Sequence, residues 1–264
     1  MTQSSSKNIF RANKISVKYQ RQDILNKLNI SLIDGKITAI LGPNGSGKST
    51  LLKALSGLIP CHSGNILIND QNISHINRTD LAKLLSILPQ SPEAPADITV
   101  SQLVSYGRYA YSSLFSKNKK EDHKQVKWAL AVTNLTELAE SFMHELSGGE
   151  RQRVWIAMSL AQNSNYLFLD EPTTYLDIRF QFEIMQLIRN LNQQQGKTIV
   201  MVLHEIQHAL NYADYILLLN HGRVHSYAPV EEMILSGAIE EVFKIRIKQF
   251  TEDGDNHFTI CNHK

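Results

Sequence analysis

The sequence has few cysteines, no long apolar run and almost no net charge, and each of these features excludes a class of protein. Its two cysteines, Cys61 and Cys261, are too few for a disulfide framework and indicate reduced cytosolic thiols. No apolar run approaches the roughly 20 residues of a membrane-spanning helix, and the first seven residues lack the apolar core of a signal peptide. A formal net charge of +2 gives no basic footprint for a nucleic-acid partner.

The composition that remains is that of an ordinary globular protein. Of the 264 residues, 42% are hydrophobic and 20% are charged, which allows a substantial core. Short apolar runs that end in turn residues and precede helical patterns predict a parallel α/β sheet. These runs are 37–41, 166–169, 197–203 and 215–219, with helices expected at about 50–58 and 178–191. Without a membrane span, a protein of this kind could act at a membrane only by docking on other subunits.

Two regions depart from this pattern. The runs 9–19, 28–33 and 64–68 predict a smaller, N-terminal antiparallel sheet. From Pro92 to Ala161 the pattern is largely helical, with Trp128, Ala131 and Leu135 expected on one helix face. We therefore predict one α/β domain over 1–264, with an antiparallel β-subdomain at its start and 91–162 as an inserted α-helical subdomain.

A glycine-rich segment after the run 37–41 fits the phosphate-binding pattern G-x-x-x-x-G-K-[ST]. Glycines let backbone N–H groups curl around an anion, and the helix that follows points its positive end at the phosphates. The lysine would reach the β- and γ-phosphates, and the serine hydroxyl would ligate Mg²⁺. The sequence therefore predicts a P-loop NTPase core that binds ATP and Mg²⁺ through Gly42, Pro43, Asn44, Gly45, Ser46, Gly47, Lys48, Ser49 and Thr50.

Two acids close the predicted strand 166–169. Asp170 could hold the Mg²⁺ shell, and Glu171 beside it could polarise an attacking water. Acids at strand ends are common surface chemistry, so this pair predicts a catalytic site only in combination with the phosphate loop.

A second glycine-rich helix start lies at 146–150. Ser147, Gly148 and Gly149 precede a helical stretch and form another N-terminal anion site. Taken alone, the segment could equally be an ordinary helix cap. Because one fold does not need two such sites for one nucleotide, we expect this one to face the γ-phosphate bound by a second copy of the chain.

The segments 42–49, 146–150 and 166–171, together with His204, resemble the nucleotide-binding subunit of ABC transporters, in the same order and over nearly the whole chain. The resemblance implies roles for further positions. Tyr19 would stack on adenine, and Gln90 would touch Mg²⁺ or the lytic water and report to the membrane subunit. Asp177 would act across the dimer interface, and His204 would contact the γ-phosphate.

The resemblance also implies a mechanism with a homodimer. Two copies would bind two Mg·ATP, each between the phosphate loop of one copy and Ser147–Gly149 of the other. Glu171 would act as general base, His204 and Gln90 would position the water and the γ-phosphate, and Lys48 would stabilise transition-state charge. The metal ligands would be Ser49, Gln90 and Asp170.

A competing pattern is H-E-x-x-H, which His204-Glu-Ile-Gln-His208 also fits. A zinc peptidase needs a third protein ligand and places both histidines inside one helix, whereas His204 adjoins a predicted buried strand. The ATPase interpretation is therefore favoured. Glu205 departs from the family, which usually has aspartate after this histidine.

The chain carries one set of motifs and no heptads between 50 and 147, which disfavours DNA-repair and translation relatives. Gly107-Arg108-Tyr109 and the segments 146–153 and 169–178 resemble the ATPases of bacterial iron–siderophore importers, those for ferric citrate and hydroxamates above all. That resemblance implies two integral-membrane permease subunits, a periplasmic or lipoprotein substrate-binding protein, and a place on the cytoplasmic face of the inner membrane. A haem or vitamin B12 importer, or a soluble ABC-type regulator, stays open as an alternative.

Overall fold

The computed structural model describes residues 10–20, 22–90, 92–111, 119–252 and 255–262. The described residues form two compact units, one made of the chain up to Ile76 and from Asn192 onward, the other of Asn77–Leu191. Three parts of the sequence predictions lie outside the described residues: residues 1–7, which lack the apolar core of a signal peptide, Ile9 of the first predicted strand, and residue 91 of the predicted insertion. The predicted insertion at 91–162 falls within the second unit, and its status as a separate subdomain stays a prediction.

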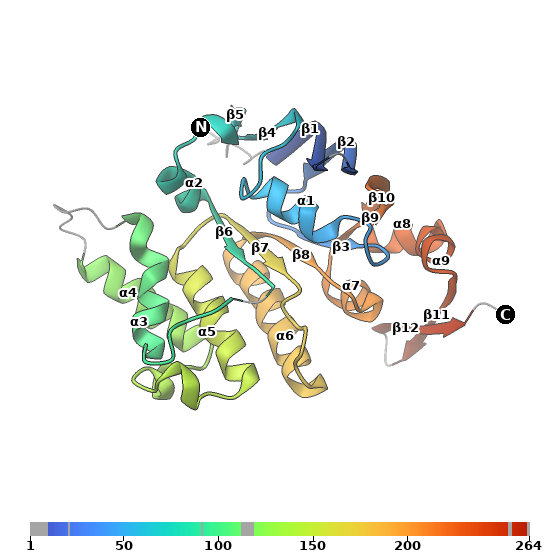
Figure 1. Ribbon diagram of the computed structural model, residues 1–264. Coiled ribbons are helices and arrows are strands. Elements are labelled where there is room, and N and C mark those ends of the chain that lie inside the picture. The colour runs from blue at the N-terminus through green and yellow to red at the C-terminus, as the bar shows by residue number, and fades with distance from the viewer. Residues whose placement is uncertain (1–9, 21, 91, 112–118, 253–254, 263–264) are drawn as a thin grey trace, which may run out of the picture. The chain divides into compact units, whose positions relative to one another are not determined.

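The first unit contains the antiparallel sheet, in the order β2-β1-β4-β5. Its strands are β1 (Phe10–Tyr19), β2 (Gln22–Leu32), β4 (Ser63–Ile68) and β5 (Gln71–Asn72), which lie together in Figure 1. The predicted antiparallel sheet is therefore confirmed. The start of β2 was placed six residues too late because a register shift between Leu25 and Leu28 of this strand interrupts the two-residue alternation by which a strand is recognised.

A parallel sheet forms the centre of the same unit. Strand β3 (Ile37–Leu41) lies between β8 (Thr198–Val202) and β9 (Tyr215–Asn220), parallel to both, and β10 (Arg223–Pro229) pairs antiparallel with β9. Every residue of β3 and β8 is buried, as continuous apolar runs in parallel sheets predict. Helices α1 (Lys48–Leu55) and α7 (Ile206–Tyr212) follow the carboxyl ends of β3 and β8. The sheet thereby places the phosphate loop and His204 at the ends of neighbouring strands.

The end of the chain adds elements that the sequence analysis did not predict. Helices α8 (Val230–Leu235) and α9 (Ala238–Phe243) precede a hairpin of β11 (Ile245–Glu252) and β12 (Asp255–Asn262). The Gln207 side-chain amide donates a 2.8 Å hydrogen bond to the carbonyl oxygen of Phe258 and so fastens the hairpin to α7.

The second unit joins two strands to a group of helices. Strands β6 (Leu85–Leu88) and β7 (Tyr166–Asp170) are parallel, and α2 (Arg78–Leu84) precedes β6. Between them lie α3 (Val100–Ser105), the 3-10 segment η2 (Tyr106–Tyr111), α4 (Lys119–Val132) and α5 (Gly148–Ala161); α6 (Ile178–Gln195) follows β7. Figure 1 shows α3, α4 and α5 gathered on one another.

The buried face of α4 differs from the prediction. Val126, Ala129 and Leu130 are buried, whereas Ala131 is exposed and Trp128 only half-buried. Leu135 is buried as expected but lies beyond the end of the helix. The prediction was wrong because apolar residues occupy almost every position from 126 to 131, so the sequence does not select one face, and packing against α3 and α5 does.

Arg108, in the Gly107-Arg108-Tyr109 segment, fastens these helices together. Its Nε atom lies 2.8 Å from Asp122 Oδ1 on α4, and Nη1 donates a 2.9 Å hydrogen bond to the carbonyl of Ala161 at the end of α5. The guanidinium also lies 3.8 Å from the centre of the Tyr111 ring. In the sequence, Gly107-Arg108-Tyr109 indicated only a resemblance to a subfamily. In the structure, its arginine also packs these helices together.

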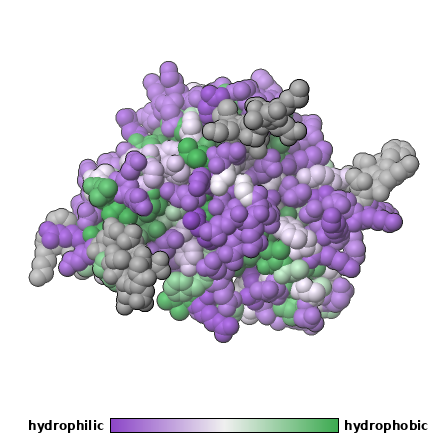
Figure 2. Space-filling model, turned by 180° about the vertical axis from the view of Figure 1, so that it is seen from behind, coloured by the Kyte–Doolittle hydropathy of each residue, from purple (hydrophilic) through white to green (hydrophobic). Residues whose placement is uncertain are grey.

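Among the described residues, no helix is both long and apolar enough to cross a bilayer. The surface seen in Figure 2 is largely hydrophilic, and its apolar residues form separate patches.

Candidate nucleotide site

The phosphate loop connects β3 to α1 in the first unit. Gly45 and Gly47 adopt φ angles of 76° and 99°, in the left-handed region that glycine enters without strain. The Lys48 ammonium donates hydrogen bonds to the carbonyls of Gly42 at 2.9 Å and Pro43 at 3.2 Å, so its charge lies over the curled backbone. This is the arrangement of an anion nest followed by a helix N-terminus.

Gly42 is required for a different reason. A Cβ atom at this position would lie 2.1 Å from the carbonyl oxygen of Leu219 on β9 and 2.6 Å from Ser46 Oγ. The loop is therefore pressed against the end of the neighbouring strand, and the close approach of two backbones leaves no space for a side chain.

Tyr19 and His204 belong to the same unit as the phosphate loop. Tyr19 ends β1 with a half-exposed ring, which suits a base-stacking surface. His204 is exposed in the connection between β8 and α7.

The structure disfavours the zinc-peptidase alternative. Helix α7 begins at Ile206, so His204 lies outside the helix that carries His208, and the two do not share a helix face. In the described part of the chain no three His, Cys, Asp or Glu residues are grouped to hold a metal ion. His208 is buried, and burial lowers its pKa, an effect that the Glu205 carboxylate opposes.

The second unit brings two predicted catalytic residues together. Gln90 Nε2 donates a 2.5 Å hydrogen bond to Glu171 Oε2, and the Thr174 hydroxyl donates to the same oxygen at 3.0 Å. Glu171 has a φ of 54°, a left-handed conformation that costs a non-glycine residue about 1–3 kcal/mol. Asp170, the last residue of β7, is buried beside it. The sequence analysis missed Thr174, for which the only signal was a hydroxyl three residues after Glu171.

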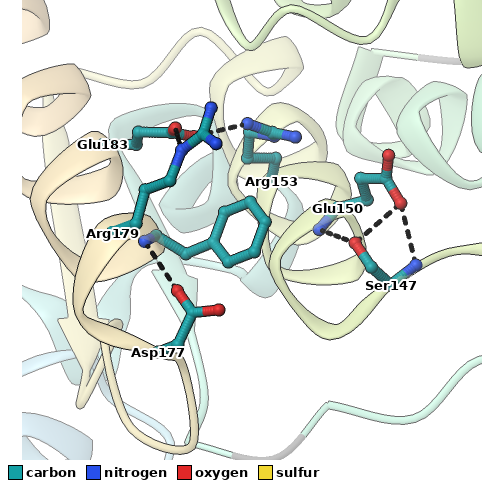
Figure 3. A network of polar contacts seen from close by, with 7 residues as sticks. Ser147, Glu150, Arg153, Asp177, Arg179 and Glu183 are labelled. Atoms are coloured by element: carbon teal, nitrogen blue, oxygen red, sulfur yellow. Dashed lines mark hydrogen bonds and ion pairs between the residues drawn. The ribbon is translucent and has the colours of Figure 1, made fainter.

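The Ser147 segment is a helix start whose polar groups are paired with one another (Figure 3). Ser147 Oγ accepts a 3.3 Å hydrogen bond from the Glu150 N–H, and Glu150 Oε2 accepts from the Ser147 N–H at 2.8 Å and from its hydroxyl at 2.7 Å. These bonds, from the hydroxyl first and the backbone second, lower the pKa of the Glu150 carboxyl. The structure therefore contains the capping box that the helix-cap alternative predicts.

Asp177 lies at the start of α6 and accepts a 3.1 Å hydrogen bond from the Phe180 N–H. Next to it, Arg153 Nη1 on α5 contacts Glu183 Oε2 at 3.0 Å, and Arg179 Nε contacts Glu183 Oε1 at 3.0 Å. Figure 3 shows Arg153, Arg179 and Glu183 grouped together near both Asp177 and the Ser147 segment. The sequence analysis gave Arg153 and Glu183 no role in the site.

The predicted site residues thus fall into two sets. The phosphate loop, Tyr19 and His204 are in the first unit, and Gln90, Asp170, Glu171, Ser147–Gly149 and Asp177 are in the second.

Comparison with known proteins identifies the class. A model of the ABC transporter family matches residues 25–174, and the chain belongs to that family as an ABC-type ATPase. The chain is 43% identical, over 94% of its length and 93% of the relative's, to the iron(3+)-hydroxamate import ATP-binding protein FhuC of Bacillus subtilis strain 168. Within the family it is therefore an ATP-binding protein of the iron–siderophore import group.

Solved structures agree with this classification. An inward-facing structure described as a metal-chelate type ABC transporter superposes with a TM-score of 0.82 at 29% identity, covering 96% of this chain and 97% of that one. The dimeric cassette MJ0796, bound to ADP and Pi after hydrolysis, has a TM-score of 0.73 at 28% identity and covers 84% of this chain and 98% of its own. Cassettes of this family dimerise and pair with membrane permease subunits in importers.

Proposed function

We propose that this chain hydrolyses ATP to drive uptake of a ferric siderophore through two separate permease subunits, at the cytoplasmic face of a bacterial inner membrane. The observation that carries the catalytic part is the 2.5 Å hydrogen bond between Gln90 and Glu171. The cargo follows from the 43% identity to a protein named for iron(3+)-hydroxamate import. A periplasmic or lipoprotein substrate-binding protein delivers the cargo, and this chain contacts only ATP and its protein partners.

Glu171 is the general base of the reaction. Donors from Gln90 and Thr174 both contact Oε2, so the carboxylate is held in one orientation, which a base that takes a proton from a positioned water needs. His204 and Gln90 position the γ-phosphate and the water, Lys48 stabilises the charge that develops on the phosphoryl oxygens, and Tyr19 stacks on the adenine.

The predicted metal ligands fit Mg²⁺. Ser49 offers a hydroxyl, Asp170 a buried carboxylate and Gln90 an amide oxygen, and Mg²⁺ prefers oxygen donors. The Gln90 amide nitrogen is the atom that faces Glu171, so the oxygen of this side chain is the atom suited to a metal. When bound, Mg²⁺ neutralises charge on the β- and γ-phosphates.

The site is shared between two copies of the chain. The γ-phosphate held by Gly42–Thr50 of one copy meets Ser147, Gly148 and Gly149 of the other, with Asp177 acting across the interface. In support, a Cβ atom at Gly148 would meet no atom of its own chain within 4 Å, so this side of the helix start is open.

The catalytic proposal is tested by Glu171→Gln, with Lys48→Ala beside it. Glu171→Gln removes only the base, so we expect nucleotide binding to persist while turnover falls on the order of a hundredfold or more. Lys48→Ala removes a phosphate contact and should weaken binding itself. Glu232→Gln, at an exposed glutamate of α8, is the matched control and should leave both unchanged. Wild-type turnover in Glu171→Gln would remove this residue from the role of base.

The cargo is tested in cells. Deletion of the gene should impair growth on a ferric siderophore as sole iron source but not on abundant free iron, and the wild-type chain, but not Glu171→Gln, should restore growth. Recovery of integral-membrane partners in detergent distinguishes an importer from a soluble regulator. Normal siderophore uptake by the deletion strain, in the absence of a redundant cassette, would overturn the iron assignment and leave the ATPase assignment standing.

A further inference from the structure

Phe180 contacts both segments of the second unit that are expected to face another copy. Its backbone N–H donates to Asp177 Oδ1 at 3.1 Å. Its ring lies against Gly149, where a Cβ atom would sit 2.7 Å from both Cγ and Cδ1 of the ring. One residue of α6 thus touches Asp177 through its backbone and the Ser147 segment through its side chain.

The surrounding polar contacts strengthen the same connection. Arg153 of α5 reaches Glu183 of α6 at 3.0 Å, with its guanidinium 5.8 Å from the centre of the Phe180 ring. The Arg153 side chain is only 18% exposed, so this ion pair is less screened by water than a surface pair. Gln152 Nε2 also donates a 2.9 Å hydrogen bond to the Pro172 carbonyl, next to Glu171. The start of α5 is therefore fastened to α6 and to the segment after β7.

We propose that Phe180 is a positioning residue that makes Ser147–Gly149 and Asp177 one rigid element, so that a second copy of this chain engages both together. This inference rests on the proposed function, in which the site is shared between two copies. Gly149 has no space for a side chain because the ring covers it, whereas Gly148 beside it is open. The ring therefore fixes the helix start from behind while its other side remains available to the partner's nucleotide.

The first test is Phe180→Ala, which should lower turnover on the order of tenfold to a hundredfold, because misplacing a reacting contact by about 1 Å has an effect of that size. Binding of ATP to the isolated chain should not change, since the phosphate loop is untouched. Phe180→Tyr keeps the ring and should keep the activity. Phe182→Ala removes an exposed phenylalanine of the same helix and is the matched control, with turnover close to wild type. A loss of ATP binding in Phe180→Ala, or an equal loss of turnover in Phe182→Ala, would overturn the inference.

A mixed dimer separates positioning from general damage. In a dimer of one Phe180→Ala copy and one Lys48→Ala copy, the phosphate loop of the first meets the intact Ser147 segment of the second, so one shared site is undamaged. We expect the mixture to recover turnover that neither variant has alone. A parallel mixture of Ser147→Arg with Lys48→Ala tests sharing itself. If only the mixture of Ser147→Arg with Lys48→Ala recovers turnover, the proposed role of Phe180 is refuted. If neither mixture recovers turnover, the shared site is refuted, and this inference with it.

A double variant tests the contact itself. Gly149→Ala should lower turnover because its methyl group clashes with the ring, and Phe180→Ala removes the ring. If the contact acts as proposed, adding Gly149→Ala to Phe180→Ala lowers turnover no further. Losses that multiply would show that the two residues act independently and would contradict the inference.

Discussion

The phosphate loop and the Ser147 segment are both glycine-rich helix starts, yet the chain builds them differently. In the phosphate loop, Gly45 and Gly47 are left-handed and Lys48 lies over the curled backbone. In the Ser147 segment neither glycine has a positive φ, and the polar groups pair with one another in a capping box. The first is a complete anion nest within one chain. The second is an open helix end, and in the proposed function it acts only when a second copy docks on it.

The glycines of the two regions are needed for different physical reasons. Gly42 is constrained by a neighbouring backbone and Gly149 by the Phe180 ring, whereas Gly45 and Gly148 have no atom within 4 Å of a Cβ position. Substitutions to alanine at these positions therefore distinguish self-contained parts of the site from parts that need a partner.

The largest effect is expected from Gly42→Ala. The methyl group would be forced against the Leu219 carbonyl, and backbone atoms yield less readily than side chains, so we expect a loss of about 3 kcal/mol or more in the free energy of unfolding. ATP binding should be lost as well. Gly45→Ala, with free space but a positive φ, should lose only about 1–2 kcal/mol. Thermal melts with and without ATP measure both, and equal melting of Gly42→Ala and the wild type would contradict the close approach.

Gly148→Ala should separate stability from activity. Because its methyl group meets nothing in the chain, the free energy of unfolding should not fall and could rise by up to about 1 kcal/mol from helix propensity. Turnover should nevertheless drop by at least tenfold, since in the proposed shared site the methyl group would face the second copy's nucleotide. Denaturant unfolding and steady-state hydrolysis measure the two quantities. Full activity in a normally folded Gly148→Ala would contradict the proposed difference between the two helix starts.

Ser147→Ala removes the hydroxyl half of the capping box of α5 and should cost about 1 kcal/mol of stability. The Glu150 carboxyl would lose the hydrogen bond from the hydroxyl, the larger cause of its lowered pKa, and would keep the bond from the backbone N–H of residue 147, so its pKa should rise part of the way toward that of an exposed glutamate. A pH titration followed by NMR measures this shift, and Ser147→Thr, which keeps a hydroxyl, should retain most of the cap. An unchanged Glu150 titration in Ser147→Ala would show that the Ser147 hydroxyl is not a source of the lowered pKa.

The smallest expected effect is a loss of stability in acid that arises from His208 on α7. Burial lowers the pKa of His208 below its usual 6.5 in the folded chain, so the unfolded chain binds the extra proton more readily. Stability from this residue is complete above about pH 6.5 and is lost as the pH falls through the lower folded pKa. The protection of the α7 amides, measured as exchange relative to the intrinsic rate at each pH, should therefore fall between pH 7 and 5.5, and His208→Gln should reduce that change. Helix α5, which contains no histidine, should change less.

Patterns with short-range causes were predictable. The strand–loop–helix around Lys48, the acids after 166–169 and the helix start at Ser147 all follow from glycine conformation, capping and apolar runs. Features that depend on contacts distant in sequence were not. The Gln90–Glu171 hydrogen bond joins residues 81 positions apart. The buried face of α4 was assigned incorrectly because apolar residues occupy almost every position in the second half of the helix, and only packing selects one face.

The sequence by itself determined the family of this chain and predicted two anion-binding helix starts and a catalytic acid pair, because backbone freedom and side-chain chemistry act locally. Only the tertiary structure decided why Gly42 and Gly149 cannot carry a side chain. Gly42 has no room for a Cβ atom because a carbonyl oxygen of β9 lies 2.1 Å from the Cβ position. Gly149 has none because the Phe180 ring covers it. No local pattern contains that information, since the atoms that exclude a side chain come from elsewhere in the chain and meet it only when the protein has folded.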